Sequence, residues 1–315
     1  MKPIGGYFEL EFREGEHYHK NAIKLSTARQ CLEYILLARK YKKINIPYYT
    51  CDVLLEPIKK LGVEYNFYHI NEMLEPIFDK VLDKDEALLY TNYFGLKQNT
   101  VLSLSKQYKN LIVDNAQAFF SSPVKHTDTF YSARKFFGVP DGAYLYTDYP
   151  LDKKFPPYVP NLHTKHLVGR LVHTAEMYYN DYKESECAFS NMEIHSMSIL
   201  SEHILKALDY QQIIQRRREN YMILSHHLNN LNKIKFNISD TDDVPMAYPF
   251  WNDKVNLRHS LISQKIFIPK YWQCVFEWTT AQDIETEFTE RLYPIPIDQR
   301  YKEKEMNYII DHILE

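Results

Sequence analysis

The sequence predicts an α/β fold with a large N-terminal domain, built on a mostly parallel sheet flanked by helices, and a smaller C-terminal α+β domain. Short apolar runs with strand character alternate with helical patterns through the first half of the chain. A proline-rich connection at 149–160 follows, and beyond it a long amphipathic pattern takes over. We place the domains at 1–195 and 196–315, and a chain of 315 residues can bury a core in each.

Each element of the first half has its own local signal. Apolar residues at helical spacing behind Ser26 and Thr27 predict a helix at 27–40, and Gly62 is a typical stop for a helix at 52–61. A short helix is expected at 102–108. The apolar, β-branched or aromatic runs between them predict strands at 44–47, 63–68, 87–93, 111–114, 129–131 and 143–147.

The second half is expected to be simpler. Apolar residues recur three or four positions apart from 200 to 231, which predicts one long amphipathic helix. An extended run at 244–251 and a terminal helix at 302–314 complete the smaller domain.

Composition excludes several classes of protein. The formal net charge is -3, so no basic excess attracts nucleic acid or an anionic membrane. The four cysteines are scattered, without the spacing of a zinc site or a disulfide framework, which suits a reducing compartment. The first eleven residues lack a signal-peptide pattern, and no apolar run approaches a membrane span of roughly 20 residues. We therefore expect a cytoplasmic protein without a metal, a nucleic-acid partner or a membrane partner.

Three segments have side chains suited to chemistry. Ser26, Thr27 and Arg29 open a helix, where free N–H groups favour phosphate, although small hydroxyl residues are also ordinary caps. Asp114 ends an apolar strand, where ligands of parallel sheets bind, although an aspartate there also commonly turns the chain. Lys135 lies among aromatic residues beside Arg134, which would favour a neutral, nucleophilic amine, although most lysines are surface residues.

In their order and wording these segments resemble the DegT-like sugar aminotransferases, which are fold-type-I enzymes dependent on pyridoxal 5'-phosphate (PLP). The resemblance runs through the helix-opening run 27–29, the proline segment 47–51, the strand end Val113-Asp114-Asn115-Ala116-Gln117 and the lysine loop 135–143. It continues more loosely into 218–221 and 292–297. It implies a fold-type-I PLP transferase-like fold.

The resemblance also implies a role for each matching residue. Lys135 would carry the cofactor covalently and move a proton during the reaction. Asp114 would pair with the pyridine nitrogen, and Gln117 would lie near the phenolic oxygen of the ring. The phosphate would be held by Thr27, Ala28 and Arg29, with help from Ser132.

Four positions depart from the family pattern. Ala28 replaces the usual glycine of the phosphate run, and Ser132 precedes the lysine by three residues where the family has a serine five before it. Cys51 occupies the position of an aromatic ring that stacks on PLP, for which Tyr49 or Tyr93 could substitute, and Gly142-Ala143 replaces a glycine pair.

The resemblance implies an aminotransferase that moves an amino group from an amino acid, with glutamate as the expected donor, to a keto sugar linked to a nucleotide, and that works as a homodimer. Three alternatives stay open. The first is a PLP-dependent sugar dehydratase, although dehydratases of the family have histidine where this chain has Lys135. The second is a degenerate member that binds a sugar nucleotide or a partner without transamination, and the third is an unrelated α/β protein with chance matches.

Overall fold

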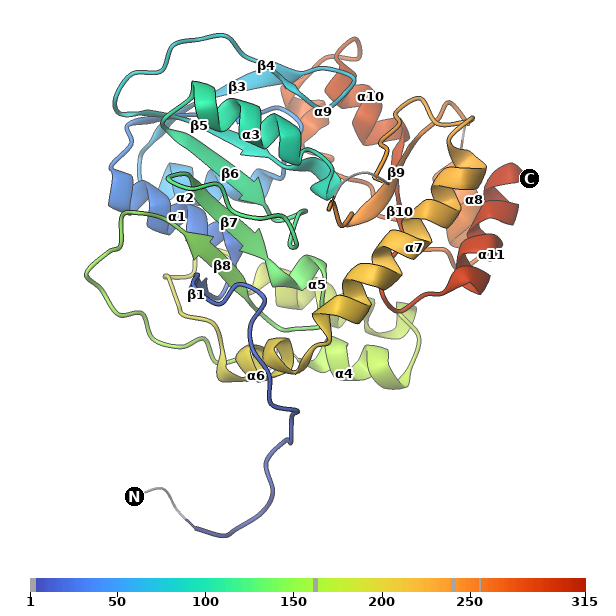
Figure 1. Cartoon of the computed structure of the whole chain (residues 1–315), viewed down its shortest axis with the longest axis horizontal. Coiled ribbons are helices and arrows are strands. Elements are labelled where there is room, and N and C mark those ends of the chain that lie inside the picture. The colour runs from blue at the N-terminus through green and yellow to red at the C-terminus, as the bar shows by residue number, and fades with distance from the viewer. Residues whose placement is uncertain (1–3, 161–163, 239–241, 255) are drawn as a thin grey trace.

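The computed structural model describes residues 4–160, 164–238, 242–254 and 256–315. Its main sheet has eight strands in the order β1-β8-β7-β6-β5-β2-β3-β4, and a second sheet pairs β10 with β9 (Figure 1). The strands of the main sheet are β1 (Ile23–Leu25), β2 (Lys43–Pro47), β3 (Glu64–Ile70), β4 (Pro76–Ile77), β5 (Glu86–Thr91), β6 (Leu111–Asn115), β7 (Asp128–Ser132) and β8 (Ala143–Tyr146). The second sheet consists of β9 (Ala247–Trp251) and β10 (Leu292–Pro296).

The helices surround these sheets. They are α1 (Ala28–Arg39), α2 (Leu55–Lys60), α3 (Gln98–Gln107), α4 (Lys165–Val172), α5 (Tyr179–Cys187), α6 (Ile199–Ala207), α7 (Tyr210–Leu228), α8 (Leu257–Ser263), α9 (Val275–Trp278), α10 (Ile284–Arg291) and α11 (Glu303–Leu314). Short 3-10 turns precede or join them: η1 (Asp52–Leu54), η2 (Tyr93–Gly95), η3 (Ala133–Lys135) and η4 (Glu176–Tyr178).

The predicted mostly parallel sheet is confirmed. Strands β3, β2, β5, β6 and β7 run parallel, whereas β1, β8 and β4 each pair antiparallel with their neighbours. Successive residues of a strand face opposite sides of the sheet. In β5, Leu89 therefore packs in a core with α1 and α2, while Leu88 and Tyr90 pack in the core shared with α3 and α7.

The long helix predicted at 200–231 is wrong in one respect, because two helices occupy it. Leu208 adopts an extended conformation (ψ 141°), which ends α6. Asp209 then caps α7, and its carboxylate accepts the N–H of Gln212 at 3.1 Å. The amphipathic pattern continues across the break because both helices lie against the same core.

The connection at 149–160 and the terminal helix follow the expectation, whereas several elements were not predicted. The terminal helix is α11, and the connection at 149–160 has no regular element. Strands β1, β4 and β10 and helices α4, α5, α8, α9 and α10 have no counterpart in the sequence-based assignment. The domain boundary at residue 195 stays a prediction.

None of the helices in the described part of the chain is long and apolar enough to cross a bilayer.

The N-terminal segment is attached to the main sheet through two buried histidines. His17 Nδ1 lies 2.7 Å from the hydroxyl of Tyr144, and His19 Nε2 lies 2.7 Å from the carbonyl of Phe119. Burial lowers the pKa of His19 to about 4, although the Phe119 carbonyl opposes the shift. His19 is therefore neutral in the folded chain at pH 7.

This lowered pKa predicts a loss of stability in acid. Between pH 6.5 and about 4 the unfolded chain binds a proton at His19 that the folded chain does not, so the free energy of unfolding falls as pH falls through this window. The full contribution is about 3 kcal/mol at roughly 1.4 kcal/mol for each pKa unit. Urea unfolding across this range should show a shallower pH dependence for His19→Gln than for the native chain. The exposed His126→Gln is the control, and an unchanged slope in His19→Gln would contradict the assignment.

Candidate active site

Lys135 lies at the wall of a large cavity. It ends η3, which directly follows β7, and its side chain is exposed. The cavity has a volume of about 670 Å³. Its walls come from the N-terminal segment, the lysine loop, α4, α6, α7 and the 298–300 segment.

Asp114 lies near Lys135 because Asp114 is close to the end of β6 and Lys135 comes just after the end of the neighbouring strand β7. β6 and β7 are parallel, with Asp114 opposite Phe130, so the chain reaches Lys135 five residues further along β7 and its turn. Asp114 is 7% exposed, and its Oδ1 accepts the N–H of Ala116 at 2.8 Å. Burial raises the pKa of Asp114, and the positive charge of Lys135 acts against the rise.

Gln117 has one unpaired polar atom. Its Oε1 accepts the N–H of Phe94 at 2.9 Å. Its Nε2 is buried and has no hydrogen-bond partner in the described part of the chain. A buried N–H without an acceptor is costly, so this atom is a candidate donor to a ligand. Of Lys135, Asp114 and Gln117, only Lys135 lines the 670 Å³ cavity.

The helix-opening run lies against the lysine loop. The N–H of Gly142 donates to the carbonyl of Ser26 at 2.6 Å, and the carbonyl of Gly142 accepts the N–H of Ala133 at 2.9 Å. Gly142 has φ +131°, and a Cβ there would lie 3.4 Å from Ala133 Cβ, so glycine suits this turn. Next to Ser26, Thr27 caps α1 by accepting the N–H of Gln30 at 3.2 Å.

The other three residues of the predicted phosphate site, Ala28, Arg29 and Ser132, have different surroundings. Ala28 is the first residue of α1 and is half-buried. The guanidinium of Arg29 donates to Glu56 at 2.6 Å and to the carbonyl of Phe189 at 2.8 Å. Ser132 immediately precedes η3 and is 8% exposed. The backbone at the start of α1 thus faces the lysine loop, while the Arg29 side chain contacts Glu56.

The proline segment meets the site through Cys51. Burial raises the pKa of the Cys51 thiol, and the charge of Lys135 opposes the shift, so these side chains are electrostatic neighbours. Tyr49 and Tyr93 stack with ring centroids 5.7 Å apart, and both are fully buried. Neither ring lines the cavity.

Asp141 is a buried carboxylate that the sequence analysis did not single out. Its Oδ1 accepts the hydroxyls of Ser198 and Ser201, both at 2.5 Å, and its Oδ2 accepts the N–H of Ser198 at 2.8 Å. Burial raises the pKa of Asp141, and the two serines act against the rise. The residue fastens the lysine loop to the start of α6.

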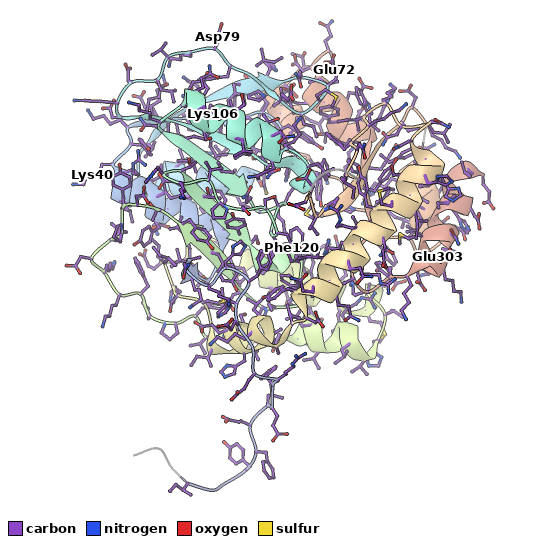
Figure 2. All side chains as sticks on the ribbon, viewed as in Figure 1. Lys40, Glu72, Asp79, Lys106, Phe120 and Glu303 are labelled. Atoms are coloured by element: carbon purple, nitrogen blue, oxygen red, sulfur yellow. The ribbon has the colours of Figure 1, made fainter. Side chains whose placement is uncertain are left out.

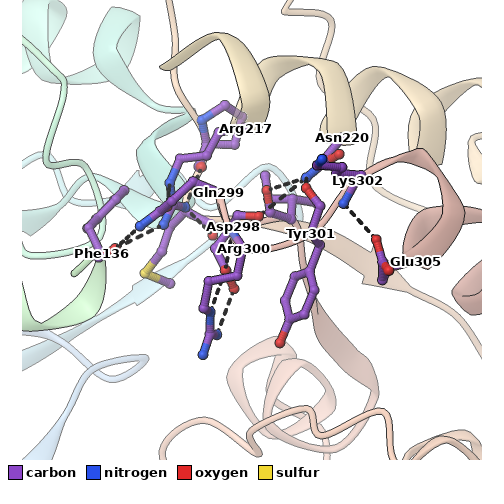
Figure 3. Close-up of polar contacts among 12 residues, drawn as sticks. Phe136, Arg217, Asn220, Asp298, Gln299, Arg300, Tyr301, Lys302 and Glu305 are labelled. Atoms are coloured by element: carbon purple, nitrogen blue, oxygen red, sulfur yellow. Dashed lines mark hydrogen bonds and ion pairs between the residues drawn. The ribbon is translucent and has the colours of Figure 1, made fainter. Parts of the chain in front are cut away.

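Arg217 of α7 was also missed, and it contacts the lysine loop (Figure 3). It is 1% exposed, and its Nε donates to Gln299 Oε1 at 3.0 Å. The carbonyl of Phe136, the residue after Lys135, accepts from Arg217 Nη2 at 3.4 Å and from Gln299 Nε2 at 2.8 Å. The guanidinium also lies 4.6 Å from the centre of the Phe136 ring. Burial lowers the pKa of Arg217 to about 10, which leaves it charged at pH 7.

The same face of α7 holds the 297–301 segment. The amide of Asn220 donates to the carbonyls of Ile297, Asp298 and Tyr301 at 3.1, 3.3 and 3.0 Å (Figure 3). Burial alone would raise the pKa of Asp298, but hydrogen bonds from Arg300 and the charges of Arg300 and Arg217 bring it below its usual value. Asp298, Gln299 and Arg300 line the cavity with Lys135.

We predict that Arg217→Met lowers the free energy of unfolding by about 3 kcal/mol, because it leaves buried carbonyls without their donors. The neighbouring Arg216 is paired with Glu219 at 3.0 Å and is 32% exposed at its side chain, so Arg216→Met should cost less than about 1 kcal/mol. Denaturant unfolding of both variants measures the difference. Equal losses would contradict the assignment.

No local pattern marks Arg217 or Asp141 as important. An arginine within a polar run of a helix normally faces water, and an aspartate between proline and glycine normally forms a turn. Only the packing of α7 and α6 against the lysine loop makes them internal.

A group of metal-ligand residues lies elsewhere, at His69, Asp283 and Glu285. His69 Nδ1 lies 3.2 Å from both carboxylate oxygens of Glu285, and Glu285 also accepts the N–H of Ile70 at 2.8 Å. These contacts join α10 to β3, so a structural role accounts for the group.

Known structures share this architecture. An aminotransferase of Brucella abortus described by the names DegT, DnrJ, EryC1 and StrS aligns with a TM-score of 0.62 and 13% identity, over 93% of this chain and 85% of that one. The chain therefore has the sugar aminotransferase fold. A sugar aminotransferase from Micromonospora echinospora aligns with a TM-score of 0.62 and 15% identity, over 93% and 86% of the two chains.

The fold also occurs in an enzyme with a different reaction. The GDP-4-keto-6-deoxy-D-mannose-3-dehydratase of E. coli, with bound hydrated PLP, aligns with a TM-score of 0.61 and 12% identity, over 92% of this chain and 87% of that one. No family model matches the sequence. No curated protein matches it either. The predicted fold class is therefore confirmed by similarity to solved structures and not by sequence similarity.

Proposed function

We propose that this chain is a PLP-dependent aminotransferase that moves an amino group from an amino acid, with glutamate as the expected donor, to a nucleotide-linked keto sugar. The observation that carries the proposal is the proximity of Lys135 to the buried Asp114 within the sugar aminotransferase fold. Charge from Lys135 acts on the buried Asp114 carboxylate, and the two follow neighbouring parallel strands. An amine and a carboxylate at the ends of such strands suit a ligand bound between them.

Three features of the chain fit PLP. The Asp114 carboxylate suits the protonated nitrogen of a pyridine ring, and the unpaired Nε2 of Gln117 suits a phenolate oxygen. The N-terminus of α1, a helix of 12 residues, suits a phosphate through its free backbone N–H groups. These are the residues we assign to the cofactor: Thr27, Ala28, Arg29, Asp114, Gln117, Ser132 and Lys135.

Each side chain then has a distinct task. PLP, when bound, supplies a ring that withdraws electrons from the carbon bearing the amino group. The Asp114 carboxylate keeps a proton on the ring nitrogen. The Lys135 amine would hold the cofactor covalently and, once free, would accept the proton from the α-carbon of the amino acid. The cavity beside Lys135 offers about 670 Å³ for the substrates.

The proposal extends to the setting of the enzyme. We propose that it acts on small molecules in the cytoplasm and works as a homodimer, without a nucleic-acid or membrane partner.

Borohydride trapping tests the proposal. The purified chain is incubated with PLP, reduced with borohydride and digested, and the peptides are analysed by mass spectrometry. The expected result is a visible absorbance band that borohydride removes, with the cofactor mass on the peptide that contains Lys135. A chain that shows neither the band nor the modified peptide is not a PLP enzyme, and the non-catalytic alternative then replaces this proposal.

A further inference from the structure

The segment before Gly15 forms an arm that leaves the body of the molecule beside α6 (Figure 1). Gly15 anchors it, because a Cβ at this position would lie 2.2 Å from the carbonyl oxygen of Lys206, so only glycine fits. Beyond this anchor the arm carries large apolar side chains that are mostly uncovered. Tyr7 is 100% exposed, Phe8 93% and Leu10 72%. The side chains at the outer end of the arm stand clear of the rest of the molecule in Figure 2, whereas Phe12 packs against His203 of α6 with ring centroids 5.7 Å apart.

A second uncovered apolar surface lies on α4. Val168, Leu171 and Val172 are 60%, 87% and 67% exposed. Their spacing of three and four residues places them on one side of the helix. The opposite side is packed, since Gly169 is buried against the ring of Tyr178. An apolar stripe on one exposed side of a packed helix is typical of an interface.

The two surfaces carry opposite charge. Residues 4–12 include Glu9 and Glu11 and no basic residue, whereas residues 164–175 include Lys165 and Arg170 and no acidic residue. Lys165 is paired with Asp181 at 2.5 Å. Among the described residues, Arg170 has no acidic partner, and its side chain is exposed. An arm with apolar and acidic side chains therefore complements the apolar and basic face of α4.

Both surfaces border the cavity beside Lys135. Leu10 and Phe12 line it from the arm, and Leu167, Val168 and Leu171 line it from α4. The cavity therefore has apolar walls from the arm and from α4, and both segments also have apolar side chains that are exposed to solvent.

We propose that residues 4–12 form an exchange arm that docks on the α4 face of a second copy of this chain, and that the arm of that copy docks on α4 in return. A two-fold axis makes each contact twice, which suits surfaces that are complementary rather than identical. Docking would bury four large apolar side chains of each arm, because Ile4, Tyr7, Phe8 and Leu10 are 92%, 100%, 93% and 72% exposed. The inference rests on the proposed homodimer and names the segment that joins it.

Site-specific photocrosslinking tests the exchange. A benzoylphenylalanine replaces Phe8 in the full chain, and the irradiated protein is separated by mass and mapped by peptide analysis. We expect a product of twice the chain mass, in which residue 8 is joined to the α4 peptide 165–172. Mixing this chain with a tagged chain that lacks the probe should give tagged crosslinked product. Crosslinking within one chain, or to any other segment of the partner, would overturn the proposal.

Charge reversal supplies a second, independent measurement. Light scattering should show the native chain as a dimer. Arg170→Glu should raise the dissociation constant of this dimer at least about tenfold, because it would place an acidic side chain opposite Glu11 of the partner's arm. Adding Glu11→Arg to Arg170→Glu should restore association. The matched control is Ile77→Ser with Val81→Ser, which alters exposed apolar residues far from α4 in the sequence and should leave the dimer intact.

The outcomes separate this inference from the proposed function. A dimer that Arg170→Glu and the arm probe leave unaffected overturns the exchange arm while the homodimer stands. A native chain that is monomeric overturns both. Cofactor capture at Lys135, measured in the same samples, reports on the enzyme proposal whichever of these results is found.

Discussion

Lys135→Ala should abolish covalent capture of PLP and lower the rate of amino transfer roughly a thousandfold or more, because the chain then lacks both the amine that holds the cofactor and the base that moves the proton. The variant should fold normally, since the Lys135 side chain is exposed at the cavity wall. The measurement combines mass spectrometry after borohydride reduction with a single-turnover assay that uses glutamate.

The matched control is Lys106→Ala on α3, whose side chain is exposed on the outer surface (Figure 2). It should capture PLP as the native chain does. If Lys135→Ala retains the cofactor mass on another lysine, Lys135 is not the attachment site.

Asp114→Asn should separate activity from stability. The asparagine keeps an oxygen that can accept the N–H of Ala116 but cannot keep a proton on a pyridine nitrogen. We expect PLP still to be captured at Lys135 and the turnover rate to fall by about 10²-fold or more. Burial raises the pKa of Asp114, so its charge weakens the unliganded fold at neutral pH, and removing that charge should leave the melting temperature unchanged or higher.

Asp128→Asn is the counterpart for Asp114→Asn. Asp128 is a buried carboxylate on the adjacent strand β7, where it accepts from Arg39 at 2.7 Å and from Thr147 at 2.6 Å. Burial raises the pKa of Asp128 as well, but its loss leaves the largely buried Arg39 guanidinium without its paired carboxylate. Asp128→Asn should therefore lower the melting temperature and leave the turnover rate of the folded enzyme unchanged. If Asp114→Asn lowers stability and spares turnover in the same way, Asp114 is a structural residue.

Strands β2, β3, β5, β6, β7 and β8 of the main sheet were predictable because they are short, largely apolar and bounded by turns, whereas the short strands β1 and β4 were not predicted. Strand β10 was not predicted either, since Pro294 and Pro296 lack the N–H group that a strand normally donates. Pro294 lies opposite Pro249 of β9, and a position without ladder hydrogen bonds tolerates proline on both strands. Helix α5 was missed because it exposes most of its side chains and has no periodic apolar signal. Helix α4 was missed although Leu167, Val168, Leu171 and Val172 have helical spacing, because the run is only eight residues long.

The residues of the candidate site also fall into those that the sequence predicts and those that it does not. Lys135, Asp114 and Gln117 stand in runs whose residue order is distinctive, so a single sequence is enough to nominate them. Arg217 and Gln299 are separated from Lys135 by at least 82 residues of chain, and nothing near either one in the sequence signals the contact. Arg29 was predicted only in part. The sequence indicates that it lies at a helix start, but its hydrogen bond to Glu56 could not be predicted from the sequence.

The side chains of Arg217 and Gln299 hold the lysine loop through its main-chain carbonyl at residue 136. Arg217 and Gln299 bind the carbonyl of residue 136, and Asn220 binds three more carbonyls, so these bonds require a backbone path and not particular partner side chains. Nearly any residue at 136, 297, 298 or 301 supplies the same acceptor. Core packing still restricts Phe136 and Ile297, but these hydrogen bonds do not, which gives one physical reason why an architecture can persist after sequence identity has fallen to 12–15%.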